Sequence, residues 1–298
     1  MLVKTCIIFN PAAGGAKANR FCDRLAALSR KCALKPTCAS GSGCALAAEA
    51  VREGFEVIVA AGGDGTVNEV LNGIGQVPGA FGHTRLAVLP LGTINVFARE
   101  IGIPAGFPQA WQIIQEANES YIDLPEVHFT FKGQDQRRLF LQMAGAGWDS
   151  RAIELVNWER KKKFGALAYV MAGLKALRGP LPQIITSNGT DTLAGQLVLI
   201  GNGRFYGGNY NLFPLADLRD GVLDVSVFPR LNWEGVVRAC WGVLTNQLYQ
   251  AGAVRHFKAE TLEVHCPSSV PFHVEGENVG FLPAKFTVRR KTLRIIVP

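Results

Sequence analysis

The sequence lacks any long apolar segment of the kind that crosses a membrane. No stretch of about 18 or more residues is apolar and uncharged throughout, which argues against a membrane-spanning helix. The first ten residues follow a strand pattern and do not have the layout of a signal peptide. We therefore expect a soluble, cytoplasmic protein.

The sequence also lacks paired cysteine motifs. Its seven cysteines are odd in number and none forms a Cys-x-x-Cys pair, so neither a disulfide framework nor a zinc site is predicted. Cys32, Cys38 and Cys44 recur every six residues, but we expect them on different elements and not as metal ligands. Internal repeats and low-complexity segments are absent as well.

The composition is that of a compact protein with a basic surface. Of the 298 residues, 48% are hydrophobic and 18% are charged, which excludes extensive disorder and allows two domains of ~100–200 residues each. The 31 basic and 24 acidic residues leave a net charge of +7, which favours anionic partners. No aromatic stacking motif accompanies this charge, so we expect no nucleic-acid partner.

The first third of the chain alternates short apolar runs with helical patterns. Strands are expected at residues 4–9, 34–37, 57–59 and 86–89, with helices at residues 20–28 and 45–52 and after residue 65. This alternation is typical of a doubly wound, parallel α/β sheet with helices on both faces. Ligands of such sheets bind outside the carboxyl ends of the strands.

From about Tyr121 the pattern changes to many short alternating strands with glycine and proline turns, which predicts a β-sandwich domain with helical insertions. Helical patterns interrupt the strands at residues 151–160, 163–177 and 233–248. We therefore place an α/β nucleotide-binding domain at residues 1–120 and a β-sandwich substrate domain at residues 121–284. A final strand within residues 285–298 is free to return to the first domain.

A glycine-rich turn, Gly62-Gly63-Asp64-Gly65, follows the third apolar run. Its glycines let the backbone turn tightly and approach a ligand, and the helix beyond them offers unpaired N–H groups to an anion. Asn68, Glu69 and Asn72 fall on a polar face of that helix, where they are free to serve a site. The turn therefore predicts phosphate binding; the alternative is an ordinary turn in which Asp64 only caps the helix.

Two further turns follow neighbouring strands. The run Asn10-Pro11-Ala12-Ala13-Gly14-Gly15 comes after the first strand, and the run Pro90-Leu91-Gly92-Thr93-Ile94-Asn95 after the fourth. All three turns are expected at the carboxyl ends of parallel strands. Their convergence is stronger evidence for an anion site than any one of them.

Together these motifs resemble the catalytic domain of the diacylglycerol kinase family, which includes sphingosine kinases, ceramide kinases and bacterial lipid kinases. In chain order the matching motifs are Asn10-Pro11 with Gly14-Gly15, Gly62–Asn72, Leu89–Ala98, Phe164–Tyr169, Gly201-Asn202-Gly203 with Gly207-Gly208, Asp220–Val225 and Glu275-Gly276-Glu277. The resemblance covers nearly the whole chain, and its length and motif order are typical of a bacterial, single-chain lipid kinase.

The resemblance implies that ATP lies in a cleft between the two domains. Its γ-phosphate would pass to a lipid hydroxyl, such as that of diacylglycerol, a related glycerolipid or a sphingoid base, which requires groups that position phosphates and neutralise charge. Lys17 is the cation nearest to the first loop, or else a solvated helix charge. The residues expected to bind the nucleotide are Asn10, Thr37, Gly62, Gly63, Asp64, Gly65, Thr66, Asn68, Glu69, Gly92, Thr93 and Asn95.

Glu275 and Glu277 are the candidate general bases, with Asp64 as a further catalytic residue. They flank Gly276 near the end of a strand pattern, where alternating side chains share one face and the glycine keeps the approach open. The family usually has Asp-Gly-Glu, so Glu275 adds a methylene and shifts the carboxylate by ~1.5 Å. Glu277 therefore remains a rival base, and a charged hairpin turn is the structural alternative.

By the same resemblance, Asp217, Asp220 and the backbone carbonyl of Val222 would bind Mg²⁺, since oxygen ligands suit this hard ion. In relatives an aspartate follows the asparagine of the Gly-Thr-x-Asn motif and connects this metal to the active site. Here that position is Val96, so the connecting network is altered or absent. Turn-forming aspartates without a metal are the alternative.

A basic cluster, residues 160–163, lies beside an amphipathic stretch that extends to residue 178. This pattern fits either peripheral binding to the anionic inner face of a membrane or a core helix with a solvated basic end. The sequence leaves a homo-oligomer open.

Two alternatives to a lipid kinase remain at this stage. A soluble kinase of the NAD kinase type shares Gly-Gly-Asp-Gly-Thr, although the Asn10-Pro11 turn and the Glu275-Gly276-Glu277 turn favour lipid kinases. A regulator that binds nucleotide or lipid but has lost catalysis is suggested by Val96 and by the altered first carboxylate.

Overall fold

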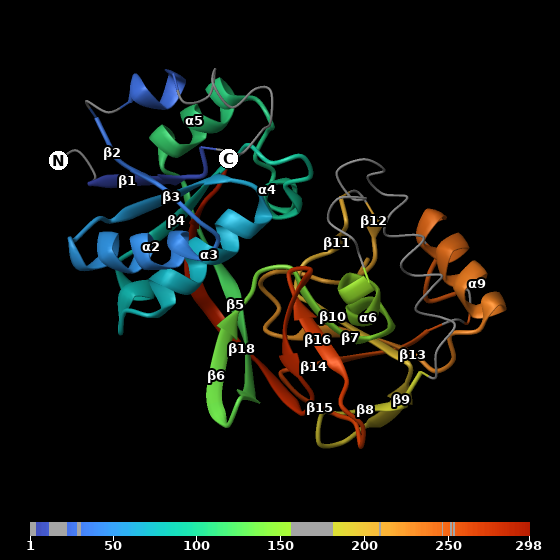
Figure 1. Ribbon diagram of the computed structural model, residues 1–298. Helices are drawn as coiled ribbons and strands as arrows, with labels where there is room; N and C mark the ends of the chain where they lie inside the picture. The colour runs from blue at the N-terminus through green and yellow to red at the C-terminus, as the bar shows by residue number, and fades with distance from the viewer. Residues whose placement is uncertain are drawn as a thin grey trace.

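The structure, a computed structural model, consists of an α/β half and a β-sandwich half that lie side by side (Figure 1). It describes residues 4–11, 23–28, 31–155, 181–208, 210–245, 247–250, 252 and 254–298. Two large sheets organise the described chain, one of ten strands and one of six. The ten-stranded sheet runs from the outer edge of the α/β half into the sandwich.

Four parallel strands form the sheet of the α/β half, in the order β2-β1-β3-β4. These strands are β1 (Thr5–Phe9), β2 (Ala33–Pro36), β3 (Val57–Gly62) and β4 (Arg85–Pro90). Every residue of β3 and β4 is buried, as expected for a parallel sheet covered on both faces. The predicted doubly wound α/β sheet is confirmed.

Helices cover this sheet on both faces. The helical elements are α2 (Ser42–Arg52), α3 (Asp64–Gly75), the 3-10 helix η2 (Ala80–Gly82), α4 (Val96–Glu100) and α5 (Phe107–Glu116), and residues 23–26 are helical as well. Helices α2 and α3 pack together on one face and α5 lies on the other (Figure 1). A Cβ on Gly73 would lie 2.2 Å from the Cys44 carbonyl oxygen, so glycine allows α2 and α3 to approach closely.

The sandwich half is built from antiparallel strands. The ten-stranded sheet supplies β5 (Glu119–Phe131), β6 (Gln134–Leu139), β8 (Ile184–Ser187), β9 (Thr192–Gly195), β15 (Thr261–His265) and β18 (Ala284–Ile296). The six-stranded sheet comprises β14 (Arg255–Ala259), β13 (Leu223–Phe228), β10 (Leu197–Gly201), β7 (Met143–Gly147), β16 (Pro271–Val274) and β17 (Glu277–Phe281), in that order. A small hairpin pairs β11 (Phe205–Tyr206) with β12 (Tyr210–Asn211).

The sandwich core lies between these two sheets. Phe129 and Phe272 meet edge to face with ring centroids 5.0 Å apart, and Phe286 packs against both Phe140 and Phe272. The alternating burial of β15 places its apolar side chains in this core and its polar ones in solvent. The predicted β-sandwich is therefore confirmed.

Strand β18 belongs to both halves. It pairs antiparallel with β15 and along most of its length with β5, and near its end it pairs parallel with β4. Arg294 of β18 and Arg85 of β4 both bind Glu119 of β5, at 2.7 and 2.8 Å. The exact domain boundaries at residues 120 and 284 stay a prediction, because one continuous ladder connects the two halves.

Two helices of the sandwich half lie within the described residues. Helix α6 (Trp148–Leu155) begins three residues before the expected start, and α9 (Trp233–Leu244) ends four residues before the expected end. The helix predicted at residues 163–177 lies outside the described residues. No described helix combines the length and the apolar character needed to span a bilayer.

Candidate nucleotide and phosphoryl-transfer site

The carboxyl ends of the parallel strands are drawn together by backbone hydrogen bonds between their loops. The N–H of Asn10 donates to the Ala61 carbonyl at 3.2 Å, and the N–H of Thr37 donates to the Phe9 carbonyl at 2.8 Å. The N–H of Leu91 likewise donates to a carbonyl at the end of β3, at 2.9 Å. Since β2 and β3 flank β1 on opposite sides, the loops meet at a topological switch point, where α/β sheets bind ligands.

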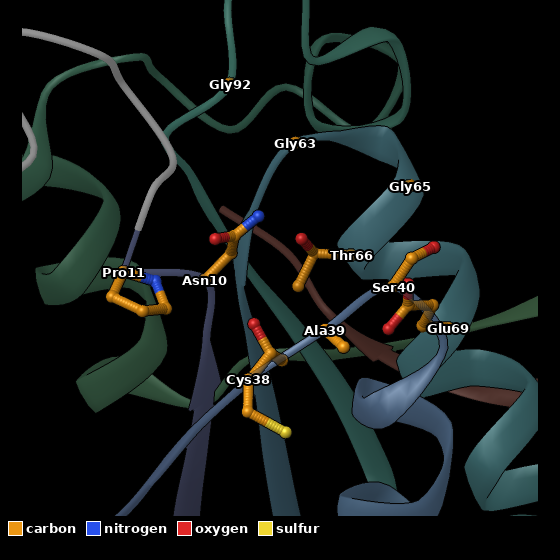
Figure 2. A pocket seen from close by; sticks show the side chains of 11 residues that line it. Asn10, Pro11, Cys38, Ala39, Ser40, Gly63, Gly65, Thr66, Glu69 and Gly92 are labelled. Atoms are coloured by element: carbon orange, nitrogen blue, oxygen red, sulfur yellow. The ribbon is translucent and has the colours of Figure 1, made fainter.

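A pocket of about 560 Å³ opens between these loops. Figure 2 shows the side chains of Asn10 and Thr66 entering the same space. The residues that line the pocket are Asn10, Pro11, Thr37, Cys38, Ala39, Ser40, Gly63, Gly65, Thr66, Glu69 and Gly92. Seven of these were predicted from the sequence, and the other four were missed. Cys38, Ala39 and Ser40 directly follow Thr37, so the position of the whole segment after β2 could have identified them.

Close approach explains the glycines around the pocket. A Cβ on Gly92 would lie 2.6 Å from the Gly63 Cα atom, so the loops after β3 and β4 touch through their backbones. A Cβ on Gly62 would lie 2.3 Å from the Thr66 hydroxyl. Gly63 is the N-cap of α3, so the first N–H groups of that helix and its positive dipole end border the pocket.

The polar face of α3 holds the structure together, contrary to the expectation that its side chains are free for a ligand. Both carboxylate oxygens of Glu69 accept backbone N–H groups at the start of α2, from Gly41 and Gly43, each at 2.8 Å. Asn72 donates to the Leu139 carbonyl and accepts from the Leu139 N–H, both at 2.9 Å. Asn68 accepts from the Asn72 amide at 2.9 Å and does not line the pocket.

The remaining predicted residues of the α/β half shape the loop after β4. Asp64 does not cap its own helix by its side chain; its Oδ1 accepts the N–H of Phe97 in α4 at 3.1 Å. Asn95 adopts a left-handed backbone with φ of 53° and donates to the Gly92 carbonyl at 2.8 Å. Thr93 is exposed in the same loop and does not line the pocket.

Glu275 lies in a tight hairpin turn and points back into the protein. With φ of 52° and 78°, Glu275 and Gly276 form the two-residue turn between β16 and β17. Glu275 Oε1 accepts the N–H groups of Leu141 at 2.6 Å and Gln142 at 2.8 Å. Burial raises the pKa of Glu275 to about 7, although these N–H groups act in the opposite direction.

Glu277 lies on the other side of this turn. The expectation that it shares a strand face with Glu275 is wrong, because the turn places Glu275 at its tip and Glu277 in β17, opposite Val274. Glu277 is exposed, and a Cβ on Gly65 would lie 3.8 Å from its Oε1. The turn therefore brings the half-buried carboxylate of Glu275 and the exposed carboxylate of Glu277 toward the start of α3.

Buried polar atoms without hydrogen-bond partners in the described chain lie near Glu275. Gln142 is buried, and neither its side-chain oxygen nor its nitrogen has a hydrogen-bond partner in the described chain. Asn202 donates to the Leu141 carbonyl at 2.8 Å, while its Oδ1 has no partner there. Two residues before Glu275, on β16, His273 is bonded to the buried carboxylate of Asp149 at 2.6 Å. The side chains of Gln142 and Asn202 can therefore form hydrogen bonds with a polar group that binds near Glu275.

The loop before β13 does not fit a metal ion as arranged. Asp220 Oδ1 accepts the Val222 N–H at 3.1 Å, and Asp220 Oδ2 accepts the Lys258 ammonium at 2.8 Å. Lys258 also donates to the Leu215 carbonyl at 2.9 Å. The positioned Lys258 ammonium therefore already neutralises the Asp220 carboxylate. Asp217 Oδ1 accepts the Arg219 N–H at 3.0 Å. Mg²⁺ at this loop therefore stays a prediction from the resemblance.

Two predicted cationic features, Lys17 and the basic cluster at residues 160–163, lie outside the described residues. Val96, which replaces the family's aspartate, is the first residue of α4, next to its N-cap Asn95. Its apolar side chain offers no oxygen to a metal or to water.

Comparison with known proteins identifies the family. Residues 4–127 match the model of the diacylglycerol kinase catalytic domain, and residues 142–297 match the YegS C-terminal NAD kinase beta sandwich-like domain. The chain belongs to the diacylglycerol kinase family. It is therefore a lipid kinase, an enzyme that uses a nucleotide and acts on a lipid.

Curated relatives agree with this family, and solved structures share the fold. A Pseudomonas aeruginosa PAO1 protein named "Probable lipid kinase YegS-like" is 30% identical over 280 residues, which cover 90% of this chain and 85% of the relative. The diacylglycerol kinase of Bacillus subtilis strain 168 is 28% identical over 88% of this chain and 84% of its own length. A solved structure of a diacylglycerol kinase from Bacillus anthracis Sterne has a TM-score of 0.72 at 19% identity, covering 99% of this chain and 97% of that one. Yeast NADH kinase has a TM-score of 0.55 at 12% identity, covering 100% and 84%, which shows a shared fold.

Proposed function

We propose that this lipid kinase transfers the γ-phosphate of ATP to a hydroxyl of diacylglycerol or of a related glycerolipid or sphingoid base. The observation that carries the proposal is the position of Glu275. Burial raises the pKa of its carboxyl group to about 7, and the negative charge of Asp64, in the first turn of α3, also acts to raise it. A group with such a pKa accepts a proton from an alcohol near neutral pH.

In this proposal the nucleotide binds in the pocket between the loops. Its phosphates would accept hydrogen bonds from the first N–H groups of α3 and from the Thr66 hydroxyl, with Gly63 and Gly92 allowing close approach. Asn10 and Thr37 would hold the rest of the nucleotide. When bound with ATP, Mg²⁺ would neutralise phosphate charge; no residue of this chain is assigned to that ion.

Glu275 is the proposed general base. Its Oε1 is held by two backbone N–H groups, and its Oε2 makes no hydrogen bond within the described part of the chain, which leaves it for the acceptor hydroxyl. As the hydroxyl oxygen forms its bond to the γ-phosphorus, its proton would pass to Glu275 and ADP would leave. Glu277, beside Gly65, is then a second carboxylate that orders the nucleotide end of the site.

The test is transfer of label from γ-labelled ATP into a panel of acceptors. Diacylglycerol, monoacylglycerol, sphingosine and ceramide in mixed micelles are compared with NAD as the soluble control. We expect label in one lipid and a loss of roughly 100-fold or more in Glu275→Gln, the range for removing a general base.

Three results would contradict the proposal. Label in NAD would instead support a soluble kinase of the NAD kinase type. ATP binding without transfer to any lipid would support a regulator that has lost catalysis. Full activity in Glu275→Gln with loss in Glu277→Gln would move the base to Glu277.

A further inference from the structure

Helix α9 has large aromatic side chains on its solvent side. Trp233 and Trp241 are each 66% exposed, although tryptophan is usually well buried. They lie eight residues apart, which places them within ~80° of each other around the helix axis. Val236 and Ala239 of the same helix pack against a hydrophobic cluster of the sandwich half, so the helix has one packed side beside the side that carries the tryptophans.

Further exposed apolar residues lie on the elements that connect α9 with the phosphate loops. Helix α9 contacts β12, β12 pairs with β11, and β11 contacts α4, and Figure 1 shows the hairpin between the two helices. Tyr210 on β12 is 51% exposed and Ile94, just before α4, is 46% exposed. A Cβ on Gly208 of the hairpin would lie 3.5 Å from the Ile94 side chain. We call Ile94, Tyr210, Trp233 and Trp241 the apolar rim.

The hairpin is fixed to the catalytic half by a charged contact. Glu100 of α4 accepts the Arg204 guanidinium at 2.8 Å and the Arg204 N–H at 2.9 Å. The Glu100 side chain is almost fully buried, whereas the Arg204 side chain is 45% exposed, so the contact is only partly shielded from water. This contact holds the hairpin, with Tyr210 of the apolar rim, next to α4 and the loop that contains Gly92.

The charge around α9 favours an anionic surface. Arg230 precedes the helix and Arg238 lies on it, both exposed, and Glu234 is its one acidic residue. Glu234 forms an ion pair with Arg238, which leaves Arg230 to supply net positive charge. Tryptophan and tyrosine prefer the boundary between headgroups and acyl chains, because an apolar ring sits beside a polar N–H or O–H.

We propose that the apolar rim docks on an anionic lipid bilayer, with α9 lying in the headgroup layer. The inference rests on the proposed function, because an acceptor with acyl chains resides in a bilayer and the enzyme must bind it there. Docking at the rim would bring the bilayer next to the loop after β4, so that a lipid hydroxyl need travel only a short path to Glu275. Helix α9 thereby acts as a membrane anchor that does not cross the bilayer.

Vesicle binding tests this docking surface. The full chain is sedimented with vesicles of phosphatidylcholine with and without phosphatidylglycerol, and tryptophan quenching by brominated lipids is recorded. We expect Trp233→Ala with Trp241→Ala to weaken binding to the anionic vesicles roughly 100-fold, about tenfold for each tryptophan, and to lose most of the quenching. Phe281→Ala is the matched control, because Phe281 is a large apolar residue, 43% exposed, on the edge strand β17 and outside the apolar rim.

Kinase assays separate this inference from the proposed function. The double variant should lose activity on acceptor in vesicles and keep it on a short-chain acceptor dispersed as monomers. Tryptophan-dependent vesicle binding without phosphate transfer would overturn the function and leave the surface standing. Equal vesicle binding by the double variant and the native chain would overturn the surface, as would a dimer in ultracentrifugation that the two substitutions dissociate.

Discussion

At the scale of single residues, Glu275 combines a strained backbone with a buried charge. A left-handed backbone costs a residue with a side chain ~1–2 kcal/mol relative to the usual helical region, and burial raises the pKa of its carboxyl group to about 7. The strained backbone and the raised pKa both occur at the tip of the hairpin that faces α3. We infer that they allow Glu275 to accept a proton.

The raised pKa of Glu275 predicts opposite effects of Glu275→Gln on activity and stability. The folded state binds the carboxyl proton more tightly than the unfolded state, so this stabilisation is complete below about pH 4.5 and is lost as pH rises through about 7. Glutamine does not ionise, so we expect the variant to be more stable than the native protein at pH 8, by roughly 3 kcal/mol, and equally stable at low pH. Urea unfolding at both pH values measures the difference.

The same pKa predicts the pH dependence of catalysis. Activity of the native protein should rise with an apparent pKa near 7 as Glu275 ionises, and Glu277→Gln should retain this limb. A pH profile that is flat from pH 6 to pH 8 would contradict Glu275 as the base.

The contact between Gly92 and Gly63 predicts a sensitive backbone position. In Gly92→Ala the new Cβ would lie 2.6 Å from the Gly63 Cα, so the two loops must separate. We expect the KM for ATP to rise about tenfold, ~1.4 kcal/mol. Gly82→Ala is the control, because a Cβ there meets no atom within 4 Å; similar kinetics in the two variants would argue against a phosphate cradle.

At the scale of elements, Asn72 connects α3 to β6. Its side chain binds both backbone groups of Leu139, in the way a neighbouring strand would. Asn72→Ala leaves that N–H and that carbonyl unpaired, so we expect stability to fall by ~1–3 kcal/mol, as measured by urea unfolding. Asn68→Ala on the same face loses one side-chain bond and should cost clearly less; equal losses would show that the link to Leu139 contributes little.

The loop before β13 predicts a response to chelators. The Lys258 ammonium bridges Asp220 at 2.8 Å and Asp224 at 3.4 Å, where a metal would otherwise supply the positive charge. We expect EDTA to leave the Tm unchanged and Lys258→Met to lower it. Lys285→Met, which removes an exposed surface pair with Glu263, should have little effect. A lower Tm in EDTA would instead support Mg²⁺ at this loop.

At the scale of the whole molecule, the two halves share one sheet. Strand β18 pairs with β4, β5 and β15, and Asp123, which is fully buried, accepts the N–H groups of Gly221 at 2.6 Å and Lys291 at 2.7 Å. Such continuous pairing couples the stability of the two halves. The ten-stranded sheet is complete only when both halves contribute their strands.

This coupling predicts one unfolding transition. Trp111 on α5 reports on the α/β half and Trp148 at the start of α6 reports on the sandwich. Variants that retain only one of these tryptophans should show the same thermal midpoint by fluorescence. Two separate midpoints would mean that the halves unfold independently.

Much of this architecture was predictable from local patterns. The β3 turn and α3 were recognised because apolar runs, glycines and a helical period occur within a few residues. The roles of Glu69 and Asn72 were missed, because their partners, Gly41 and Leu139, are far away in the sequence. The same reason hid the Glu275 contact with Leu141 and the Lys258 bridge to Asp220.

The pairing of β4 with β18 has a consequence for synthesis of the protein. Leu86 meets Ile295, so the outer edge of β4 leaves the ribosome roughly 200 residues before its partner does, a delay of ~10–40 s at usual translation rates. An unpaired strand edge is a site of aggregation. Nascent chains of this enzyme should therefore depend on chaperones during that interval, and slower translation should lengthen the dependence.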